Sequence, residues 1–240
     1  MPPSQPRPFE RRGSLKRLLQ RWAITRTTRR AHRLYVPSQA MADLIGWPEA
    51  RIVPFGVDRD LFHPAGTPGD EVLAVGDFYP HKRFELIVAA WSRLPEPRPT
   101  LRLIGNPAVD RESFASVRRL ADDPRVVVAG QVGLEELVRA YRRARVFVIA
   151  SEHESFSMPL AEALCSGVPA VTRDLPALRQ TAGPGAVYVA GDDVNAWSDA
   201  IGRVVSDDHL HGELGEAGLR HTEAFTWQAF ADAVVADTRG

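Results

Sequence analysis

The sequence lacks paired cysteines, long apolar segments and an excess of either charge, and each absence excludes a class of protein. Cys165 is the single cysteine among 240 residues, so the chain forms no internal disulfide, which is typical of the reducing cytoplasm. No stretch approaches the roughly 20 apolar residues that span a bilayer, and the basic N-terminus has no apolar secretory-signal core. The 30 basic and 30 acidic residues create no net field that favours nucleic acid. We therefore expect a cytoplasmic protein without a nucleic-acid partner.

Motifs for metal or nucleoside-triphosphate chemistry are also missing. No cluster of His and Cys has the spacing of a metal site, and no glycine-rich Walker motif occurs. The adjacent acids Asp192-Asp193 and Asp207-Asp208 each precede a helical pattern, where carboxylates cap helices. Cys165 ends the apolar run Leu160–Cys165 and is expected to be an inert core residue. We expect neither a metal nor a cofactor.

From residue 34 onward, short apolar segments alternate with helical patterns. Strands spaced by helices form βαβ units, which build a parallel sheet covered on both faces. Right-handed crossovers then give a doubly wound, Rossmann-like α/β fold, whose ligands bind at the carboxyl ends of the strands. The expected strands are Leu34–Val36, Ile52–Pro54, Val72–Val75, Leu101–Ile104, Val126–Ala129, Val146–Ile149, Ala170–Thr172 and Ala186–Val189. The expected helices are Phe84–Leu94, Ser113–Ala121, Leu134–Arg142, Pro159–Ser166 and Asn195–Val205, with two more in residues 209–240.

The first 35 residues form a basic tail followed by an amphipathic helix. Residues 7–33 hold ten Lys and Arg residues against one acid, Glu10. Leu15, Leu18, Leu19 and Trp22 fall on one face of a helix, opposite a basic face. Such a helix can lie on the inner face of an anionic membrane, or it can pack its apolar stripe against a neighbouring domain. We favour packing, and weak peripheral membrane contact stays open.

The sharpest local signal is the segment from Glu154 to Glu162. A strand ends near Ala150, a polar loop follows, and a helix begins with Ser157 as its N-cap. The unpaired N–H groups of that helix then face the carboxyl edge of the sheet, which suits a diphosphate. Glu162, one turn in, could accept hydrogen bonds from a ribose diol, and Glu154 could hold sugar hydroxyls. Two glutamates at this spacing also commonly form a surface ion pair and a cap. The neighbouring motifs must therefore decide between that structural role and a ligand-binding one.

Several further motifs follow the same order as in one known family. They are Val36-Pro37-Ser38, Val53-Pro54-Phe55-Gly56-Val57-Asp58, Val75-Gly76 with Lys82, Leu101–Gly105, Gly130-Gln131-Val132, Gly167-Val168-Pro169-Ala170-Val171 and Phe225-Thr226-Trp227. Together with Glu154–Glu162 they resemble the C-terminal domain of the retaining family-4 glycosyltransferases, which have the GT-B fold. The variant they are most similar to is the mannosyltransferase type. The resemblance covers roughly residues 30 to 230.

The resemblance implies a donor-binding site and a reaction. The activity it implies is retaining, metal-independent transfer of a hexose from a UDP- or GDP-sugar to an acceptor that the sequence does not identify. Lys82 would contact the diphosphate and Glu162 the ribose, and Lys82 and Glu154 would be the catalytic residues. Main-chain groups of Gly130, Gln131 and Val132 would border the nucleobase, and Glu154, Ser155, Phe156, Ser157 and Met158 would hold the sugar and the distal phosphate.

Three positions depart from the family pattern. Asp77 stands where the family usually has Arg, which replaces a cation near the diphosphate by an anion. Ser157 replaces a common Gly and adds a Cβ near the ligand. Phe55 replaces a common Asn. A non-catalytic nucleotide-sugar-binding subunit, or an inactive fragment, therefore remains an alternative to a transferase, and a sugar-nucleotide epimerase is a second.

The expected organisation is half of a GT-B enzyme. Residues 1–35 would be a remnant of the N-terminal domain, residues 36–208 the nucleotide-sugar-binding Rossmann-like domain, and residues 209–240 the C-terminal helices. About 35 residues are too few for an acceptor-binding domain of ~100–150 residues. We therefore expect most of that domain to be absent from the sequence. The chain would then be a fragment, a split subunit that pairs with a separate N-terminal-domain polypeptide, or the product of a gene whose first part lies elsewhere. Self-association is a further expectation.

Overall fold

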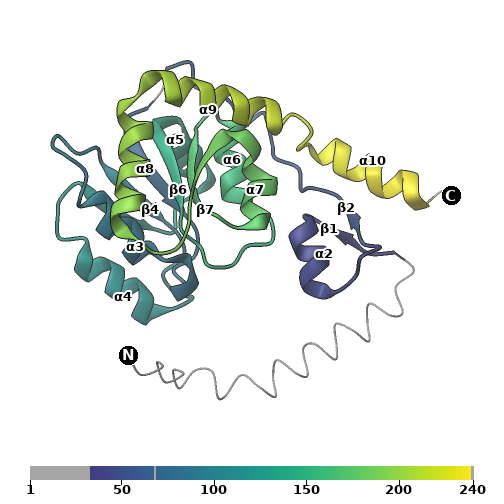
Figure 1. Cartoon of the computed structure of the whole chain (residues 1–240), viewed down its shortest axis with the longest axis horizontal. Coiled ribbons are helices and arrows are strands. Elements are labelled where there is room, and N and C mark those ends of the chain that lie inside the picture. Colours follow the sequence, from purple (N-terminus) through teal and green to yellow (C-terminus); the bar gives the residue numbers. More distant parts are fainter. Residues whose placement is uncertain (1–32, 68, 239–240) are drawn as a thin grey trace.

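The computed structural model describes residues 33–67 and 69–238, and these form a parallel six-stranded sheet between two helical layers (Figure 1). A separate pair of short strands, β1 and β2, lies beside it. The strands are β1 Tyr35–Val36, β2 Arg51–Ile52, β3 Glu71–Val75, β4 Leu101–Ile104, β5 Val126–Gly130, β6 Ala144–Ile149, β7 Ala170–Arg173 and β8 Ala186–Val189. The helices are α2 Gln39–Ile45, α3 Phe84–Trp91, α4 Arg111–Leu120, α5 Leu134–Arg143, α6 Met158–Cys165, α7 Pro176–Ala182, α8 Val194–Ser206, α9 Asp208–His221 and α10 Trp227–Thr238, with 3₁₀ turns η2 Pro80–Lys82 and η3 Gly183–Gly185.

The strand order confirms the doubly wound α/β fold. The large sheet runs β5-β4-β3-β6-β7-β8, and every neighbouring pair is parallel. The chain winds outward from β3 to β5 and then returns to the other side of β3 to place β6. The winding therefore reverses between β3 and β6, and in this topology ligands bind at the carboxyl ends of the strands that flank the reversal.

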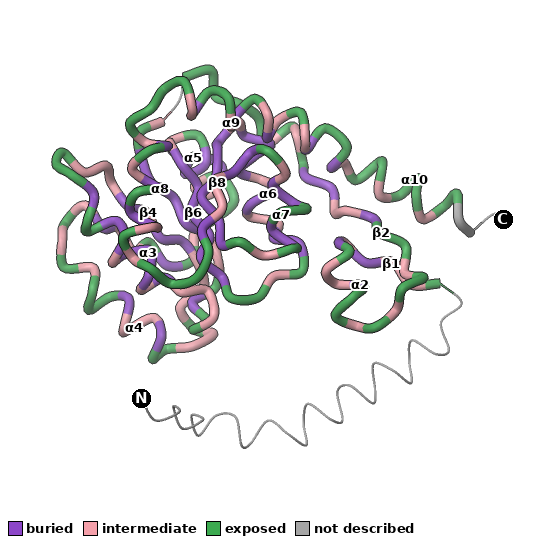
Figure 2. The backbone as a smooth tube through the Cα atoms, in the orientation of Figure 1, coloured by how far each residue is buried: buried purple, intermediate pink, exposed green. Residues whose placement is uncertain are grey.

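Two apolar clusters, one on each face, hold the sheet. On one face α3 and α8 cover the sheet with Trp91 and Trp197, both of which are fully buried. On the other face α5, α6 and α7 pack residues such as Leu160 and Leu178 against the strands. Figure 2 shows the buried backbone concentrated along these strands, while the outer faces of the helices are exposed. Because both faces are covered, the ends of the strands are left to bind ligands.

Most expected elements appear within one or two residues of their expected ends. The largest discrepancy at a helix is α3, which ends at Trp91 rather than Leu94 because Pro95 disfavours helical backbone at the residue before it. The second strand ends at Ile52 rather than Pro54, since proline has no N–H to donate to a strand. The amphipathic helix expected around Leu15–Trp22 lies outside the described residues.

Two helices were not anticipated, although each carries a local signal. The hydroxyl of Ser38 caps α2 by accepting from the backbone N–H of Met41, and Gly46 ends the helix with φ 69°. Pro176 opens α7 at the first helical position, which suits its fixed φ. Of the four acids expected at helix starts, Asp193 and Asp207 cap α8 and α9 and Asp208 lies in the first turn of α9, whereas Asp192 forms ion pairs instead.

The unit formed by β1, α2 and β2 contacts α7 and the loop before α6 through specific polar contacts. The buried hydroxyl of Ser38 donates to the carbonyl of Ser155 at 2.5 Å, and the N–H of Ala40 donates to the side chain of Gln180 at 3.2 Å. α10 projects from the body near this unit (Figure 1), and Phe55 contacts Phe230 with ring centres 6.2 Å apart. The N-terminal unit therefore touches the loop that contains Glu154.

The carboxyl edge between β3 and β4 depends on a close contact between two glycines. The N–H of Gly76 donates to the carbonyl of Ile104 at 2.9 Å, and that of Gly105 to the carbonyl of Gly130 at 3.0 Å. A Cβ on Gly105 would lie 1.8 Å from the carbonyl oxygen of Gly76. No side chain fits there unless the backbone moves.

Gly105→Ala should therefore lower the free energy of unfolding by at least about 2 kcal/mol, the cost of forcing an atom into a packed site. Gly133→Ala is the matched control, because a Cβ at Gly133 meets no atom within 4 Å and its φ is −74°. Urea unfolding of the two variants measures the difference. Equal stability would show that the sheet edge relaxes freely around position 105.

Candidate functional site

Lys82 and Glu154, predicted separately from the sequence, form an ion pair across the reversal of the sheet. Lys82 follows β3 and Glu154 follows β6, and the ammonium nitrogen lies 2.6 Å from Glu154 Oε1. Their side chains are only 20% and 10% exposed, so the pair is shielded from solvent screening. The structure thus brings the two proposed catalytic residues together, but in this state each neutralises the other.

A cavity of about 420 Å³ opens beside this pair. Lys82 contributes to its wall, and its aliphatic chain runs along Gly76, where an added Cβ would be 3.6 Å from it. Pro159, in the first turn of α6, lines the same cavity. The remaining lining residues are Val75, Asp77, Tyr79, His81 and Gly105. A cation and the N-terminus of a helix therefore share one cavity at the carboxyl edge.

Arg83 anchors the turn that carries Lys82. It has φ 56°, an unusual conformation for a non-glycine residue, and it connects η2 to α3. Its guanidinium pairs with Asp192 at 2.7 Å and with Glu152 at 3.6 Å. Asp192 also binds Arg173 at 2.5 Å, and this contact is the main reason why the pKa of Asp192 is lowered. These contacts tie the turn to the loops after β6 and β8.

The loop from Glu154 to Met158 is held by its neighbours on both sides. Phe156 is buried and packs edge-on against Phe55, with ring centres 5.6 Å apart. Its carbonyl accepts the hydroxyl of Thr181 at 2.5 Å, while the carbonyl of Ser155 accepts that of Ser38. The side chain of Phe156 therefore anchors the loop rather than facing a ligand, and its predicted ligand role can come only from its backbone.

Ser157 occupies the N-cap position of α6 but does not cap it as expected. A capping hydroxyl needs extended backbone to reach the N–H groups of the first turn, whereas Ser157 has φ 77° and ψ 86°. Its hydroxyl makes no cap hydrogen bond and finds no partner among the described residues. The first turn of α6 is consequently left without a side-chain cap, and its N–H groups are available to an anion.

Glu162 lies one turn into α6, and its carboxyl group is hydrogen-bonded to Tyr141 of α5. Glu162 Oε2 accepts the Tyr141 hydroxyl at 2.8 Å. Burial raises the pKa of Glu162, and the hydrogen bond from Tyr141 lowers it. Sequence reasoning missed Tyr141, although a tyrosine on the buried face of an amphipathic helix signals a hydroxyl in need of a partner.

Gly130, Gln131 and Val132 lie at the same carboxyl edge, two strands away from β3. Gly130 ends β5 with φ 70°, where the backbone turns away from the sheet. Gln131 is exposed, and Val132 packs against the second apolar cluster. The main-chain groups of this turn therefore lie beside the ends of the strands, where a nucleobase could contact them. Their role in binding the nucleobase stays a prediction.

Asp77 faces the solvent at the cavity rather than pairing with a neighbouring cation. Its carboxylate accepts the backbone N–H of Asn106 at 3.3 Å, and the residue is exposed. His81 stacks on Tyr79 beside it with ring centres 5.5 Å apart, and burial, followed by the charge of Lys82, lowers the pKa of His81. The anion that departs from the family pattern is thus part of the cavity wall.

The described residues offer no ready metal site. No group of three or more His, Cys, Asp and Glu side chains among them could hold an ion. The chain contains one Asp-x-Asp sequence, Asp58-Arg59-Asp60, but there Asp58 accepts the N–H groups of Asp60 and Leu61 and so caps a turn. Cys165 is fully buried as expected, and burial raises the pKa of its thiol. Within residues 33–67 and 69–238, no helix is long and apolar enough to cross a membrane.

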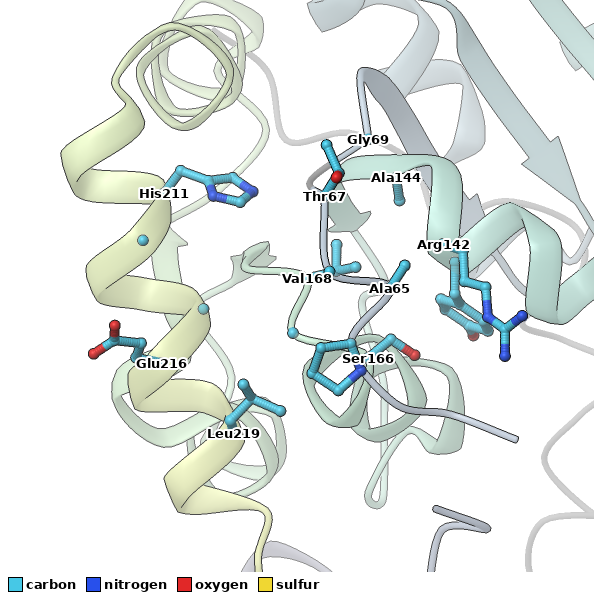
Figure 3. A pocket seen from close by; sticks show the side chains of 16 residues that line it. Ala65, Thr67, Gly69, Arg142, Ala144, Ser166, Val168, His211, Glu216 and Leu219 are labelled. Carbon is cyan, nitrogen blue, oxygen red and sulfur yellow. The ribbon is translucent and has the colours of Figure 1, made fainter. Parts of the chain in front are cut away.

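A second hollow, of about 360 Å³, lies at the opposite, amino edge of the sheet (Figure 3). His211, Glu216 and Leu219 of α9 form one wall, and Ala144, the first residue of β6, lies across from them. None of the predicted site residues lines it. The carboxyl edge therefore remains the candidate site.

Comparisons with known proteins find similarity to glycosyltransferases. A family model described as "Glycosyl transferases group 1" matches residues 69–207. The chain is 30% identical to a D-inositol 3-phosphate glycosyltransferase of Xylanimonas cellulosilytica, over 77% of the chain and 49% of that protein. It is also 30% identical to an MMP alpha-(1->4)-mannosyltransferase of Mycolicibacterium hassiacum, over 83% of the chain and 50% of that protein. The chain thus spans about half the length of these relatives.

Solved structures share the fold. Sucrose-phosphate synthase from Thermosynechococcus elongatus superposes with a TM-score of 0.75 at 27% identity, covering 87% of the chain and 58% of that structure. HepE from Anabaena, in complex with UDP and glucose, superposes with a TM-score of 0.77 at 15% identity, covering 91% of the chain and 66% of that structure. The expected kinship with GT-B glycosyltransferases is confirmed at the level of the fold.

Proposed function

The chain belongs to the group 1 glycosyl transferases, and on that premise we propose that it is the donor-binding, C-terminal half of a retaining, metal-independent hexosyltransferase. In this proposal residues 36–208 bind a UDP- or GDP-sugar, and residues 209–240 complete the domain. The observation that supports it most directly is the Lys82–Glu154 pair, which lies across the reversal of the sheet and beside the uncapped N-terminus of α6. One relative's name is that of a mannosyltransferase, which favours a hexose donor.

The proposed chemistry is stabilisation of the departing diphosphate. The sugar carbon would exchange its bond to the diphosphate oxygen for a bond to the acceptor hydroxyl oxygen. The bonding electrons then stay on the departing phosphate oxygen as negative charge, and that oxygen takes up the proton that the acceptor hydroxyl loses. The N–H groups at the start of α6, together with Lys82 once it has exchanged Glu154 for the diphosphate, would stabilise that charge, which is the usual way that enzymes lower such barriers. Glu154, released from Lys82, would accept hydrogen bonds from sugar hydroxyls, and Glu162 would accept those of the ribose. No metal is needed, because the cation and the helix N-terminus supply the positive charge.

A non-catalytic nucleotide-sugar-binding subunit is the competing proposal, and one observation favours it. Asp77 places an exposed carboxylate in the wall of the cavity that would receive the diphosphate. The carboxylate of Asp77 and the diphosphate are both negatively charged, so their repulsion opposes binding. If the repulsion between Asp77 and the diphosphate dominates, the protein would bind the donor weakly and transfer no sugar. A sugar-nucleotide epimerase would require acid and base residues beyond those described here.

The first functional prediction concerns the nucleotide alone. Calorimetry should detect binding of UDP or GDP, and Lys82→Met should weaken it by about tenfold to a hundredfold, since a hydrogen bond to a charged group contributes roughly 1.5–3 kcal/mol. Arg179→Met is the control. It removes an exposed cation of α7 that pairs with Asp174 and does not line the cavity. A folded protein that binds neither nucleotide at millimolar concentration would refute the proposed donor site.

The ion pair leads to an asymmetric prediction for Glu154. Glu154→Gln should tighten binding of the nucleoside diphosphate by several-fold, because Lys82 no longer has to leave a carboxylate. The same change should weaken the intact nucleotide sugar relative to the diphosphate, because the sugar loses a charged acceptor. Glu96→Gln is the control, because Glu96 pairs with Arg98 and Arg125 and does not line the cavity. Equal effects on both ligands would contradict the assignment of Glu154 to the sugar.

The proposal also assigns the acceptor side of the cleft to polypeptide beyond the described residues. Leu44 of α2 is 80% exposed, Trp227 of α10 is 51% exposed, and Ile52 of β2 is 41% exposed. Apolar side chains on neighbouring elements promote association. The isolated chain should therefore self-associate or bind a polypeptide that supplies the other half, and transfer sugar only in that complex.

Sedimentation velocity of the chain alone, with transferase assays before and after adding the candidate partner, measures both effects. Leu44→Lys should reduce self-association, whereas Leu120→Lys, on the distant helix α4, should not. A monomer that transfers sugar unaided would overturn the assignment of the acceptor side.

A further inference from the structure

Tyr141 of α5 is a fully buried phenol whose hydroxyl lies between two acceptors on α6. It is 2.8 Å from Glu162 Oε2 and 3.1 Å from the carbonyl oxygen of Pro159. Phe62 packs edge-on against its ring with centres 5.5 Å apart, and Phe147 lies 6.1 Å away on β6. Because the side chain has no exposed surface, its hydroxyl cannot turn to bulk water. Its hydroxyl therefore hydrogen-bonds to the two acceptors on α6.

One hydroxyl carries one proton, so Tyr141 cannot donate fully to both acceptors at once. When Glu162 is ionised, the phenol donates to the carboxylate. When Glu162 carries a proton, the carboxyl group donates to the phenol oxygen, and the phenol donates to the carbonyl of Pro159. Both arrangements use every proton and keep the carboxyl group in the same place.

We infer that Tyr141 is a positioning residue, which holds the Glu162 carboxylate in place and in its ionised form for the ribose diol of a bound nucleotide. The inference rests on the proposed function, which places a ribose at Glu162. Tyr141 has no surface with which to touch the nucleotide, so it acts through Glu162. Without the phenol, a carboxylate that is largely withdrawn from water would lose its one protein hydrogen-bond donor among the described residues.

The charged and titratable groups around Glu162 give the sign of the pH dependence. Burial raises the pKa of Glu162, and the Tyr141 hydrogen bond opposes that rise. On the same helix, burial keeps the Cys165 thiol neutral by raising its pKa, and Arg59 faces that thiol from the preceding loop. Glu162 is ionised above its pKa, so nucleotide affinity falls as the pH drops through that value. Removing the phenol raises the pKa further, and the fall then begins at a higher pH.

The test measures binding of UDP or GDP from acidic to neutral pH. Tyr141→Phe keeps the ring and its packing but removes the hydroxyl, and it should move the midpoint of the pH profile upward by about one unit, which corresponds to about tenfold in affinity. Tyr188→Phe is the matched control: it removes a hydroxyl that donates to the carbonyl of Gly183 at 2.5 Å and should leave the profile unchanged. Glu162→Gln should lose the titration of this carboxyl group and retain those of the nucleotide's phosphate and of His81 in the cavity wall.

The outcomes separate this inference from the proposed function. Wild-type protein that binds neither nucleotide refutes the donor site, and with it the role of Tyr141. Wild-type protein that binds, with a Tyr141→Phe profile identical to its own, overturns the role of Tyr141 alone. The double variant Tyr141→Phe/Glu162→Gln should bind no more weakly than Glu162→Gln, because Tyr141 acts through that carboxylate. Additive losses would show that Tyr141 serves only the packing of α5.

Discussion

The contact between Gly105 and the carbonyl of Gly76 brings two strand ends closer together than any side chain would allow. It keeps β3 and β4 at sheet spacing beyond their last paired residues, Val75 and Ile104. The chain after Gly76 then turns back over its own strand, and the side chain of Lys82 runs along that glycine. From there Lys82 reaches Glu154 on the other side of the sheet reversal. Gly76, Lys82 and Gly105 all line the cavity, so this narrow edge forms part of its wall.

The strained positions of the backbone lie at the same edge. Arg83 and Ser157 are the two non-glycine residues with positive φ within residues 33–67 and 69–238. Each directly precedes a helix, one following Lys82 and the other the Glu154 loop. Such conformations cost roughly 1–3 kcal/mol each and persist only where the surroundings enforce them. Here the ion pairs of Arg83 and the buried ring of Phe156 do so, which is consistent with a site whose geometry is selected over stability.

The fold could be predicted from the sequence because periodicity and strand spacing are local signals. Apolar runs such as Leu101–Ile104 and Ala186–Val189 have few alternatives in a chain that also contains regular amphipathic helices. The placement of Lys82, Gly130 and Glu162 at one edge follows from parallel topology alone. Side-chain pairing could not be predicted in the same way. The bond between Lys82 and Glu154 joins residues 72 positions apart, and the bond from Tyr141 to Glu162 depends on how α5 and α6 pack. Ser157 does not cap α6 because its backbone has a positive φ, and this conformation is likewise imposed by tertiary contacts.

The ion pair also has a consequence for the small anions of the cell. A free lysine at a helix N-terminus would attract inorganic phosphate, which is abundant and which resembles one end of any phosphorylated substrate. Here Lys82 is already neutralised by Glu154, and Asp77 adds a further negative charge at the mouth. A lone phosphate must therefore displace a carboxylate and face another, with no ribose or sugar to compensate. In the proposed donor site, the ion pair and Asp77 would therefore disfavour a lone phosphate, and a ligand that contacts several subsites at once would be needed to separate Lys82 from Glu154.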